Sequence, residues 1–207
     1  MGVWVSRGGT LLGFIRMHDP LREHAGAVLE RLRSLGIART VLLSGDRELE
    51  VARVAGELGI ESFHAELLPE RKAELITAEQ DAGHVVLMVG DGINDALALQ
   101  RADVGIAIGA RLSEAALGGA DAALMTPELD RVPLLVELAD QTRTTVIQNA
   151  LLGLGFSAAM FCLAAAGIVS PLSAAVLHNF GALLVVANSA RLARRSSAYD
   201  SPMDEAA

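Results

Sequence analysis

The sequence contains a single cysteine, Cys162, among its 207 residues. An internal disulfide is therefore excluded, and so is a metal site built on a Cys-x-x-Cys pair. The first residues contain no apolar stretch of the length that a signal peptide needs, so we expect no cleaved leader. Aromatic residues make up only 3% of the chain, although 52% of it is hydrophobic.

Charge is missing from one long segment, residues 144–190, which contains no Asp, Glu, Lys or Arg. Charged residues are frequent before this segment and return at Arg191, Arg194 and Arg195. The uneven distribution favours a soluble part followed by a membrane part over one globular domain. The net charge of -8 argues against nucleic acid as a partner, because phosphate binding requires clustered Lys and Arg.

The charged part has the pattern of an α/β domain. Apolar runs without alternation indicate buried strands, and helical spacing separates them, which predicts a parallel sheet covered on both faces. Ligands bind such sheets at the carboxyl ends of the strands. Asp19, Ser44-Gly45-Asp46 and residues 91–95 all fall at that edge. The expected strands are residues 11–17, 40–43, 85–89 and 104–108, and the expected helices are residues 22–35, 48–58, 70–81 and 96–101.

The uncharged segment divides into two candidate membrane helices. Residues 144–170 are long enough to cross a bilayer, Ser170-Pro171 makes a break, and residues 173–190 are at the short end of the spanning range. Arginines flank the pair on both sides, so the positive-inside rule places both ends in the cytoplasm. We therefore expect a multi-pass protein of the cell membrane with cytoplasmic termini. The alternative is two buried helices of a soluble core.

The strongest local signal is formed by Asp91 and Asp95, with Asn94 between them. Two carboxylates on a turn after a buried strand suit Mg²⁺, which takes oxygen ligands and usually also contacts phosphate. Gly90 and Gly92 permit tight backbone geometry at the ion. The alternative is a capped helix start, in which Asn94 or Asp95 is the N-cap.

Lys72 and Ser44 are candidates for contacts to a phosphoryl group. Lys72, on the helix that begins near Glu70, would neutralise the phosphoryl charge at the sheet edge. Ser44 would donate a hydrogen bond to the same group, helped by backbone N–H groups of the following helix. The alternative for Lys72 is an ordinary surface lysine. The order of Ser44-Gly45-Asp46, Lys72 and the Asp91 turn is more specific than any one of them.

That order resembles P-type ATPases. Residues 90–96 (Gly-Asp-Gly-Ile-Asn-Asp-Ala) followed by residues 102–109 are very similar to the hinge motif of that family. Three further segments resemble its Asp-x-x-Arg, Thr-Gly-Asp and Pro-x-x-Lys motifs, namely residues 19–22, 44–46 and 69–72. The heavy-metal branch is suggested by Gln148-Asn149 and by residues 188–192, which read Asn-Ser-Ala-Arg-Leu.

The resemblance implies a phosphorylation domain of the haloacid-dehalogenase (Rossmannoid) type, Mg²⁺-dependent ATP hydrolysis and transport of a heavy-metal cation across the lipid bilayer. By position, Asp91 would bind Mg²⁺, and Asp95 is a second candidate ligand. The implied catalytic residues are Lys72, Asp91, Asn94 and Asp95. The implied residues around the phosphoryl group and the nucleotide are Ser44, Gly45, Asp46, Asp19 and Arg22.

The same resemblance predicts a division of the chain into five parts. Residues 1–10 would be a remnant of the connection to a nucleotide-binding domain, and residues 11–129 part of the phosphorylation domain. Residues 130–143 would form a helical stalk with an apolar face. Residues 144–192 would form the two transmembrane helices, and residues 193–207 a cytoplasmic tail.

The family's phosphorylated aspartate stands in an Asp-Lys-Thr-Gly-Thr motif, which this sequence lacks. Covalent phosphoryl transfer cannot proceed without that nucleophile. We therefore expect the chain to be inactive alone, as a C-terminal fragment that depends on a missing N-terminal portion or on another pump subunit.

The transported metal is not indicated by the family's usual ligand positions, where Phe156-Ser157 stand in the penultimate helix. His178-Asn179 form a polar pair inside the second span, which makes them candidate ligands of the transported cation. His178 suits zinc, cobalt or nickel. The alternative is that both side chains hydrogen-bond neighbouring helices. Met160 and Cys162 are expected to pack.

Two other functions fit parts of the sequence. A phosphatase remnant of the haloacid-dehalogenase group would explain the Gly-Asp-Gly-x-Asn-Asp turn but not two membrane spans. A non-catalytic membrane protein that docks on a pump or regulates it would explain the hairpin.

Overall fold

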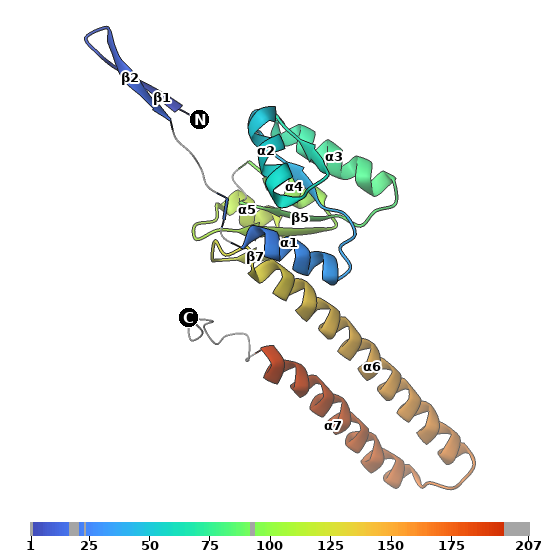
Figure 1. Cartoon of the computed structure of the whole chain (residues 1–207). Coiled ribbons are helices and arrows are strands. Elements are labelled where there is room, and N and C mark those ends of the chain that lie inside the picture. Colours follow the sequence, from blue (N-terminus) through green and yellow to red (C-terminus); the bar gives the residue numbers. More distant parts are fainter. Residues whose placement is uncertain (1, 17–20, 23, 92–93, 197–207) are drawn as a thin grey trace. The chain divides into compact units, whose positions relative to one another are not determined.

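The structure is a computed structural model that describes residues 2–16, 21–22, 24–91 and 94–196 (Figure 1). The chain divides into two compact units, Met1–Pro133 and Leu134–Ala207. Each unit is described by itself.

The first unit begins with an antiparallel hairpin of β1 (Gly2–Arg7) and β2 (Thr10–Arg16). Gly8 and Gly9 form its turn with φ angles of 56° and 82°, and two successive positive φ angles match the twist of a two-residue hairpin. The expectation that residues 11–17 belong to the parallel sheet is therefore wrong. The Gly-Gly pair reverses the chain, so β2 pairs with β1 and with no other of the described strands.

The remaining strands are all parallel but form two sheets instead of the one expected. β3 (Val41–Leu43) pairs with β4 (Ser62–His64), and the second sheet has the order β5-β6-β7. Its strands are β5 (Leu87–Gly90), β6 (Val104–Ile108) and β7 (Ala122–Leu124). β4 and β7 were not predicted, because three-residue strands are too short to show a hydrophobic period.

In the described part of this unit, five helices connect the strands, and four of them were predicted. Gly59 ends the second helix in the left-handed conformation with φ 63°, as expected for a C-terminal glycine. The helix that was missed is short and is capped by Ser113, whose Oγ accepts a hydrogen bond from the Ala116 N–H at 3.1 Å. The five are α1 (Ala25–Ser34), α2 (Glu48–Leu58), α3 (Pro69–Asp81), α4 (Ala96–Arg101) and α5 (Glu114–Gly119).

The core of this unit lies around β6 and around α2. Ile106 and Ala107 of β6 are 1% and 0% exposed, because β6 is the central strand of its sheet. This burial explains why the β6 sequence shows no alternation. One cluster joins Leu99, Ala107 and Ala116, and a second joins Leu29, Ala55 and Ile60.

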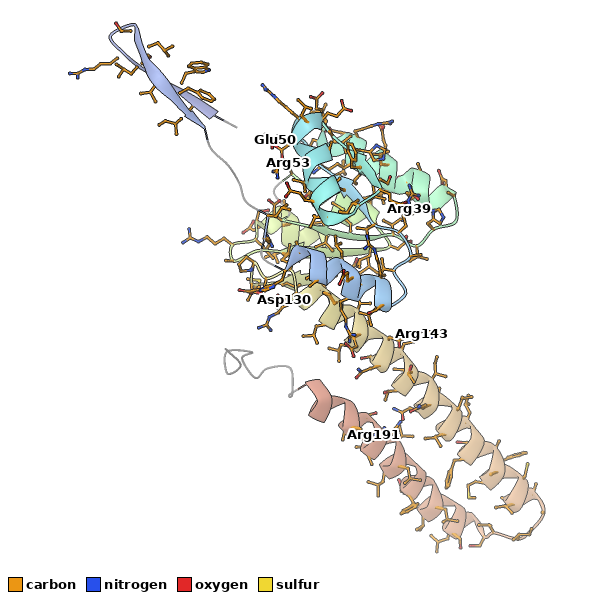
Figure 2. The ribbon with its side chains drawn as sticks, viewed as in Figure 1. Arg39, Glu50, Arg53, Asp130, Arg143 and Arg191 are labelled. Carbon is orange, nitrogen blue, oxygen red and sulfur yellow. The ribbon has the colours of Figure 1, made fainter. Side chains whose placement is uncertain are left out.

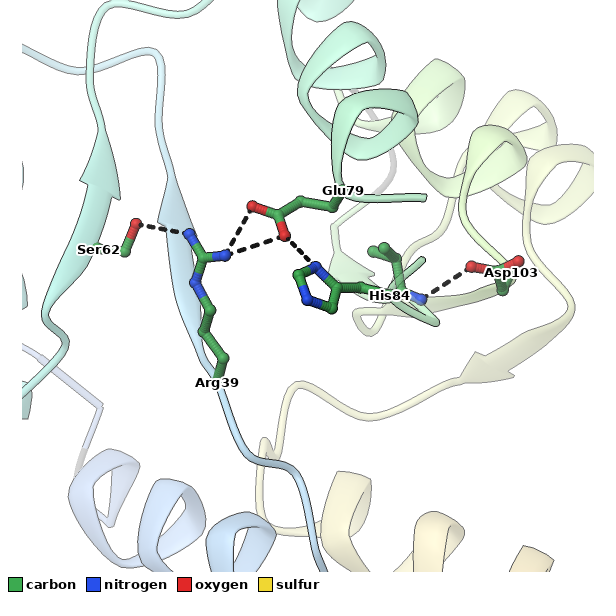
Figure 3. A network of polar contacts seen from close by, with 6 residues as sticks. Arg39, Ser62, Glu79, His84 and Asp103 are labelled. Carbon is green, nitrogen blue, oxygen red and sulfur yellow. Dashed lines mark hydrogen bonds and ion pairs between the residues drawn. The ribbon is translucent and has the colours of Figure 1, made fainter. Parts of the chain in front are cut away.

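Polar side chains join the segments at the amino ends of the strands (Figure 3). Arg39, just before β3, forms an ion pair with Glu79 of α3 at 2.9 Å. His84, which precedes β5, contacts the same carboxylate through Nδ1 at 2.8 Å. This network therefore holds the edge of the sheets opposite to the one at which ligands bind α/β folds.

The carboxylate of Asp103 joins β5 and β6, and we expect this contact to weaken in acid. Its carboxylate accepts a hydrogen bond from the Val86 N–H at 2.8 Å, which lowers the pKa of Asp103 below its ordinary value of 3.8. A depressed pKa stabilises the fold above the ordinary value and loses that stabilisation as the pH falls through the folded-state pKa. We expect the free energy of unfolding, measured by urea titration, to fall less between pH 6 and pH 3 in Asp103→Asn than in the wild type. An equal difference in both proteins would contradict this role.

The second unit is a helical hairpin. α6 (Arg131–Ala165) begins in the first unit and continues without interruption. This one helix of 35 residues covers residues 131–143 of the expected stalk and residues 144–165 of the first expected span. α7 (Pro171–Ser196) starts at the expected break, where the Ser170 hydroxyl accepts a hydrogen bond from the Ser173 N–H at 3.2 Å. Among the described residues, only α6 has both the length and the apolar composition to cross a membrane. A membrane span by α7 stays a prediction.

Side chains join α6 and α7 as antiparallel neighbours. Asn149 Nδ2 donates to Ser189 Oγ at 2.8 Å, and Asn188 Nδ2 donates to Asn149 Oδ1 at 2.9 Å. Farther along the hairpin, Gly181 lies against Phe156. A Cβ at Gly181 would be only 2.8 Å from the nearest atom of the ring, so a larger residue would not fit there. The residues that carry the resemblance to the heavy-metal branch thus hold the two helices together.

Candidate functional site

Lys72 and Asp95 meet at the carboxyl edge of β5. α3 begins at Pro69, so Lys72 lies in its first turn, and Asp95 follows the end of β5. Lys72 Nζ donates to Asp95 Oδ1 at 2.6 Å, with the two side chains only 9% and 14% exposed. A surface lysine, the alternative interpretation of the sequence, is thus excluded. Removal of either partner would leave the other charge buried and unpaired.

Asp95 occupies the N-cap position of α4, but its side chain caps no helix N–H. Its carboxylate accepts from Lys72 instead, so helix capping does not explain this residue. Gly90 leaves the space that Asp95 fills: a Cβ at Gly90 would lie 2.6 Å from Asp95 Oδ2 and 2.8 Å from Asp95 Cβ. The glycine before Asp91 is therefore required by the close approach of Asp95.

A second group of polar residues follows β3. Ser44 Oγ donates to Asp46 Oδ2 at 3.1 Å, and the Asp46 N–H donates to Ser44 Oγ at 3.1 Å. The loop after β4 is tied to the same turn, because the Leu67 N–H donates to the Ser44 carbonyl at 3.0 Å. A Cβ at Gly45 would lie 3.3 Å from the Leu67 carbonyl oxygen, so this turn also favours glycine.

A pocket of about 280 Å³ lies beside this turn. Its lining includes two carboxylates, Glu48 and Glu66, and two rings, Phe63 and His64. Glu66 has a φ of 53°, a conformation that non-glycine residues rarely adopt. The two carboxylates make this pocket unfavourable for a phosphate. A phosphate is favoured instead beside the ammonium of Lys72, which does not line this pocket.

Of the other candidate site residues in this unit, the structure describes Asp91, Asn94 and Arg22. Asp91 and Asn94 are both exposed, directly after β5 and before α4. Arg22 donates from Nη1 to the Pro127 carbonyl, which ties it to the segment before α6. Asp19 lies outside the described residues, as do Gly92 and Ile93.

The pKa of one carboxyl group in the same segment, that of Glu128, is lowered. The Thr126 hydroxyl donates to Glu128 and lowers the pKa of its carboxyl, and Arg131 and Arg22 act in the same direction. Arg22 therefore contributes to the electrostatics of the segment before α6.

The candidate ligands of a transported cation lie on α7. His178 belongs to the helix, but its side chain is outside the described part, and Asn179 is exposed. No cluster of three or more His, Cys, Asp or Glu side chains with metal-binding geometry occurs among the described residues. Cys162 is exposed on α6.

Residues 3–103 match the haloacid dehalogenase-like hydrolase family. The zinc-exporting P-type ATPase of Mycobacterium marinum is 44% identical over 186 residues, which cover 90% of this chain and 25% of the relative. The manganese-exporting P-type ATPase of Mycobacterium tuberculosis is also 44% identical, over 90% of this chain and 26% of the relative. The chain belongs to the heavy-metal P-type ATPase family. It spans about a quarter of the length of these curated relatives.

A solved structure of a family member agrees with this assignment. The crystal structure of a zinc-transporting PIB-type ATPase in the E2.Pi state matches with a TM-score of 0.80 and 36% identity, over 92% of this chain and 31% of that chain. The resemblance found in the sequence motifs is thereby confirmed, as is the haloacid dehalogenase-like α/β fold with parallel strands.

Two structural roles in this P-type ATPase chain were not foreseen. Asp121 forms two hydrogen bonds with Gly105 of β6. Its carboxylate accepts from the Gly105 N–H, and its own N–H donates to the Gly105 carbonyl, both at 2.8 Å. The pairing of Asn149 with Asn188 was also missed, although both residues were singled out as family markers. Amide side chains within the uncharged segment, residues 144–190, are the signal that points to such a contact.

Proposed function

We propose that the chain is the C-terminal part of an ATP-driven exporter or importer of a heavy-metal cation. The proposal rests on the buried contact between Lys72 and Asp95 at the carboxyl edge of β5, next to Asp91. This is the place at which α/β folds bind phosphorylated ligands. The zinc- and manganese-exporting relatives support a divalent transition-metal ion as the transported species.

In this proposal Lys72 holds the transferred phosphoryl group. Its ammonium has three N–H donors, and the donor directed at Asp95 fixes where the nitrogen lies. The remaining donors can face phosphate oxygens. The ammonium then neutralises the negative charge that develops on these oxygens in the transition state. Asp95 is thus a positioning residue, because it acts on the phosphoryl group through Lys72.

The residues present fit a magnesium ion. Asp91 is an exposed carboxylate at the strand end, and Mg²⁺ is usually bound through one or two carboxylates together with phosphate oxygens. Asp91 is exposed, whereas the Asp95 side chain is largely buried and accepts from Lys72 through Oδ1, so Asp91 is the more accessible candidate ligand of the two. When bound, the ion would neutralise phosphate charge and orient the phosphate oxygens.

The turn after β3 would complete the site around ATP. Ser44 Oγ both donates to and accepts from Asp46, so the two side chains hold each other in place. Gly45 keeps the backbone between them close to the loop after β4. We propose that Asn94 orients the phosphoryl group and that Asp46 faces the nucleotide, with Asp19 and Arg22 supporting the same edge.

The phosphoryl acceptor must come from outside this sequence, which lacks an Asp-Lys-Thr-Gly-Thr motif. Activity would thus require a longer polypeptide or a second subunit. The hairpin of α6 and α7 would cross the membrane with both ends in the cytoplasm, and His178 and Asn179 would contribute to the cation path.

Asp91→Ala tests the magnesium site directly. We expect the substitution to weaken binding of Mn²⁺, a spectroscopic substitute for Mg²⁺, about tenfold or more in the presence of phosphate, because it removes a charged oxygen ligand. Electron paramagnetic resonance of free Mn²⁺ measures this affinity on the full chain. Asp81→Ala, at the far end of α3, is the matched control and should bind like the wild type. Equal affinity of wild type and Asp91→Ala would remove Asp91 from the site.

The second candidate function is a non-catalytic membrane protein that regulates a pump, which would need no phosphoryl acceptor. Immunoblotting of native membranes with an antibody to the tail separates the two. A band several times heavier than 21.6 kDa supports the pump, whereas a membrane band at 21.6 kDa alone supports the regulator.

A further inference from the structure

A pocket of about 170 Å³ lies between α6 and α7, at the end of the hairpin where the uncharged segment stops. On α6 it is lined by one helical face, residues spaced three or four positions apart. On α7 it is lined by residues one turn apart. The lining consists of Asp140, Gln141, Thr144, Thr145 and Gln148 of α6, with Asn188 and Arg191 of α7.

The pocket carries one charge of each sign. Asp140 and Arg191 both line it, and the other lining side chains are amides and hydroxyls. The guanidinium of Arg191 opposes a metal cation, and the carboxylate of Asp140 opposes a simple anion. A ligand with a positive and a negative group matches this lining better than either ion alone.

Gln141 adds a requirement for a hydrogen-bond donor. Its Oε1 is buried and has no partner among the described residues. The nearby hydroxyl of Thr145 does not supply one, because it donates to the Gln141 backbone carbonyl at 2.9 Å. A buried amide oxygen without a donor is costly, so a rotation of the Gln141 side chain that turns this oxygen toward a ligand N–H in the pocket is favoured.

Arg191 is held where it can contact an anionic group. Its Nη1 donates to Asn188 Oδ1 at 3.3 Å, and Asn188 in turn donates to Asn149 at 2.9 Å. A guanidinium has five donors in a planar fork, which is the geometry that binds phosphate oxygens. The amide cluster between the helices thus orients the arginine.

We propose that this pocket binds the phosphoethanolamine headgroup of a membrane lipid, with Arg191 on the phosphate and Asp140 and Gln141 on the primary ammonium. The inference rests on the membrane hairpin of the proposed function, which places both charged residues at the level of lipid headgroups, just outside residues 144–190. A choline headgroup has no N–H to offer Gln141, so the pocket selects phosphatidylethanolamine over phosphatidylcholine.

Native mass spectrometry of the full chain in a non-ionic detergent tests the proposal with phosphatidylethanolamine, phosphatidylcholine and phosphatidylglycerol of identical acyl chains. We expect phosphatidylethanolamine to bind about tenfold more tightly than phosphatidylcholine, as one charge-assisted hydrogen bond predicts. Gln141→Leu should abolish this preference. Arg191→Gln should weaken binding about tenfold, whereas Arg143→Gln, an exposed α6 position outside the pocket, should not (Figure 2).

Other outcomes overturn the assignment. Equal binding of the three lipids, or tighter binding of phosphatidylglycerol, would show that no zwitterion is selected. Binding of soluble O-phosphoethanolamine without binding of the lipid would identify a free metabolite as the ligand. Extraction of the chain from membranes by alkaline carbonate would refute the membrane hairpin itself, while a retained chain without headgroup preference refutes only the pocket's role. Circular dichroism of each variant verifies that the helices are intact.

Discussion

Replacing Lys72 with methionine is expected to lower the free energy of unfolding of the first unit by about 3 kcal/mol, because it leaves the carboxylate of Asp95 buried without its partner. Both side chains are largely withdrawn from water, at 9% and 14% exposed. The same variant should lose phosphate binding, since the Lys72 ammonium is proposed to donate hydrogen bonds to the phosphate oxygens. Urea titration followed by hydrogen exchange of the α3 and α4 amides measures the first effect, and phosphate-dependent Mn²⁺ affinity the second.

The neighbouring residue supplies the control. Arg71 lies on the exposed side of the same turn of α3, where its ion pair with Glu74 is 61% and 62% exposed. Arg71→Met should therefore change stability by less than about 1 kcal/mol and leave phosphate binding intact. A double variant, Lys72→Met with Asp95→Asn, should be more stable than the sum of the single changes predicts, because it removes the unpaired charge. Additive effects would show that the two side chains do not depend on each other.

The sequence predicted the fold wherever an element was long or had a clear end signal. α2 and α4 agree with the predicted bounds, and Gly59 ends α2 as expected. The β1–β2 hairpin was missed even though Gly8-Gly9 is the signal of a tight hairpin, because the apolar run after it was assigned to the parallel sheet. Short strands such as β7 are specified by their neighbours in space, which no local pattern reports.

The candidate site was predicted in its residues but not in its contacts. The motif order identified Lys72, Asp91 and Asp95, yet it did not distinguish a surface lysine from a buried one. That distinction depends on α3 and α4 lying side by side, which brings Lys72 Nζ to 2.6 Å from Asp95 Oδ1. Such a contact joins residues 23 positions apart, and hydrophobic periodicity carries no information on it.

Gly105→Ala is expected to destabilise the first unit by about 3 kcal/mol, among the larger costs of overpacking. A Cβ at this position would lie 2.5 Å from the Leu99 carbonyl oxygen and 3.0 Å from the carbonyl carbon. Leu99 is 1% exposed and cannot move aside without opening the core between α4 and β6. The strand would have to shift instead, which strains both hydrogen bonds between Gly105 and Asp121.

A shift of β6 would also reach the site, because β6 pairs with β5 in parallel register up to Gly90, the residue before Asp91. We therefore expect Gly105→Ala to weaken Mn²⁺ binding even under conditions in which the chain is folded. Gly56→Ala is the matched control: nothing lies within 4 Å of a Cβ there, and the exposed position in α2 should gain about 0.5–1 kcal/mol from the better helix former. If Gly105→Ala proved as stable as the wild type in urea titrations, close packing of α4 on β6 would not be what requires glycine in this motif.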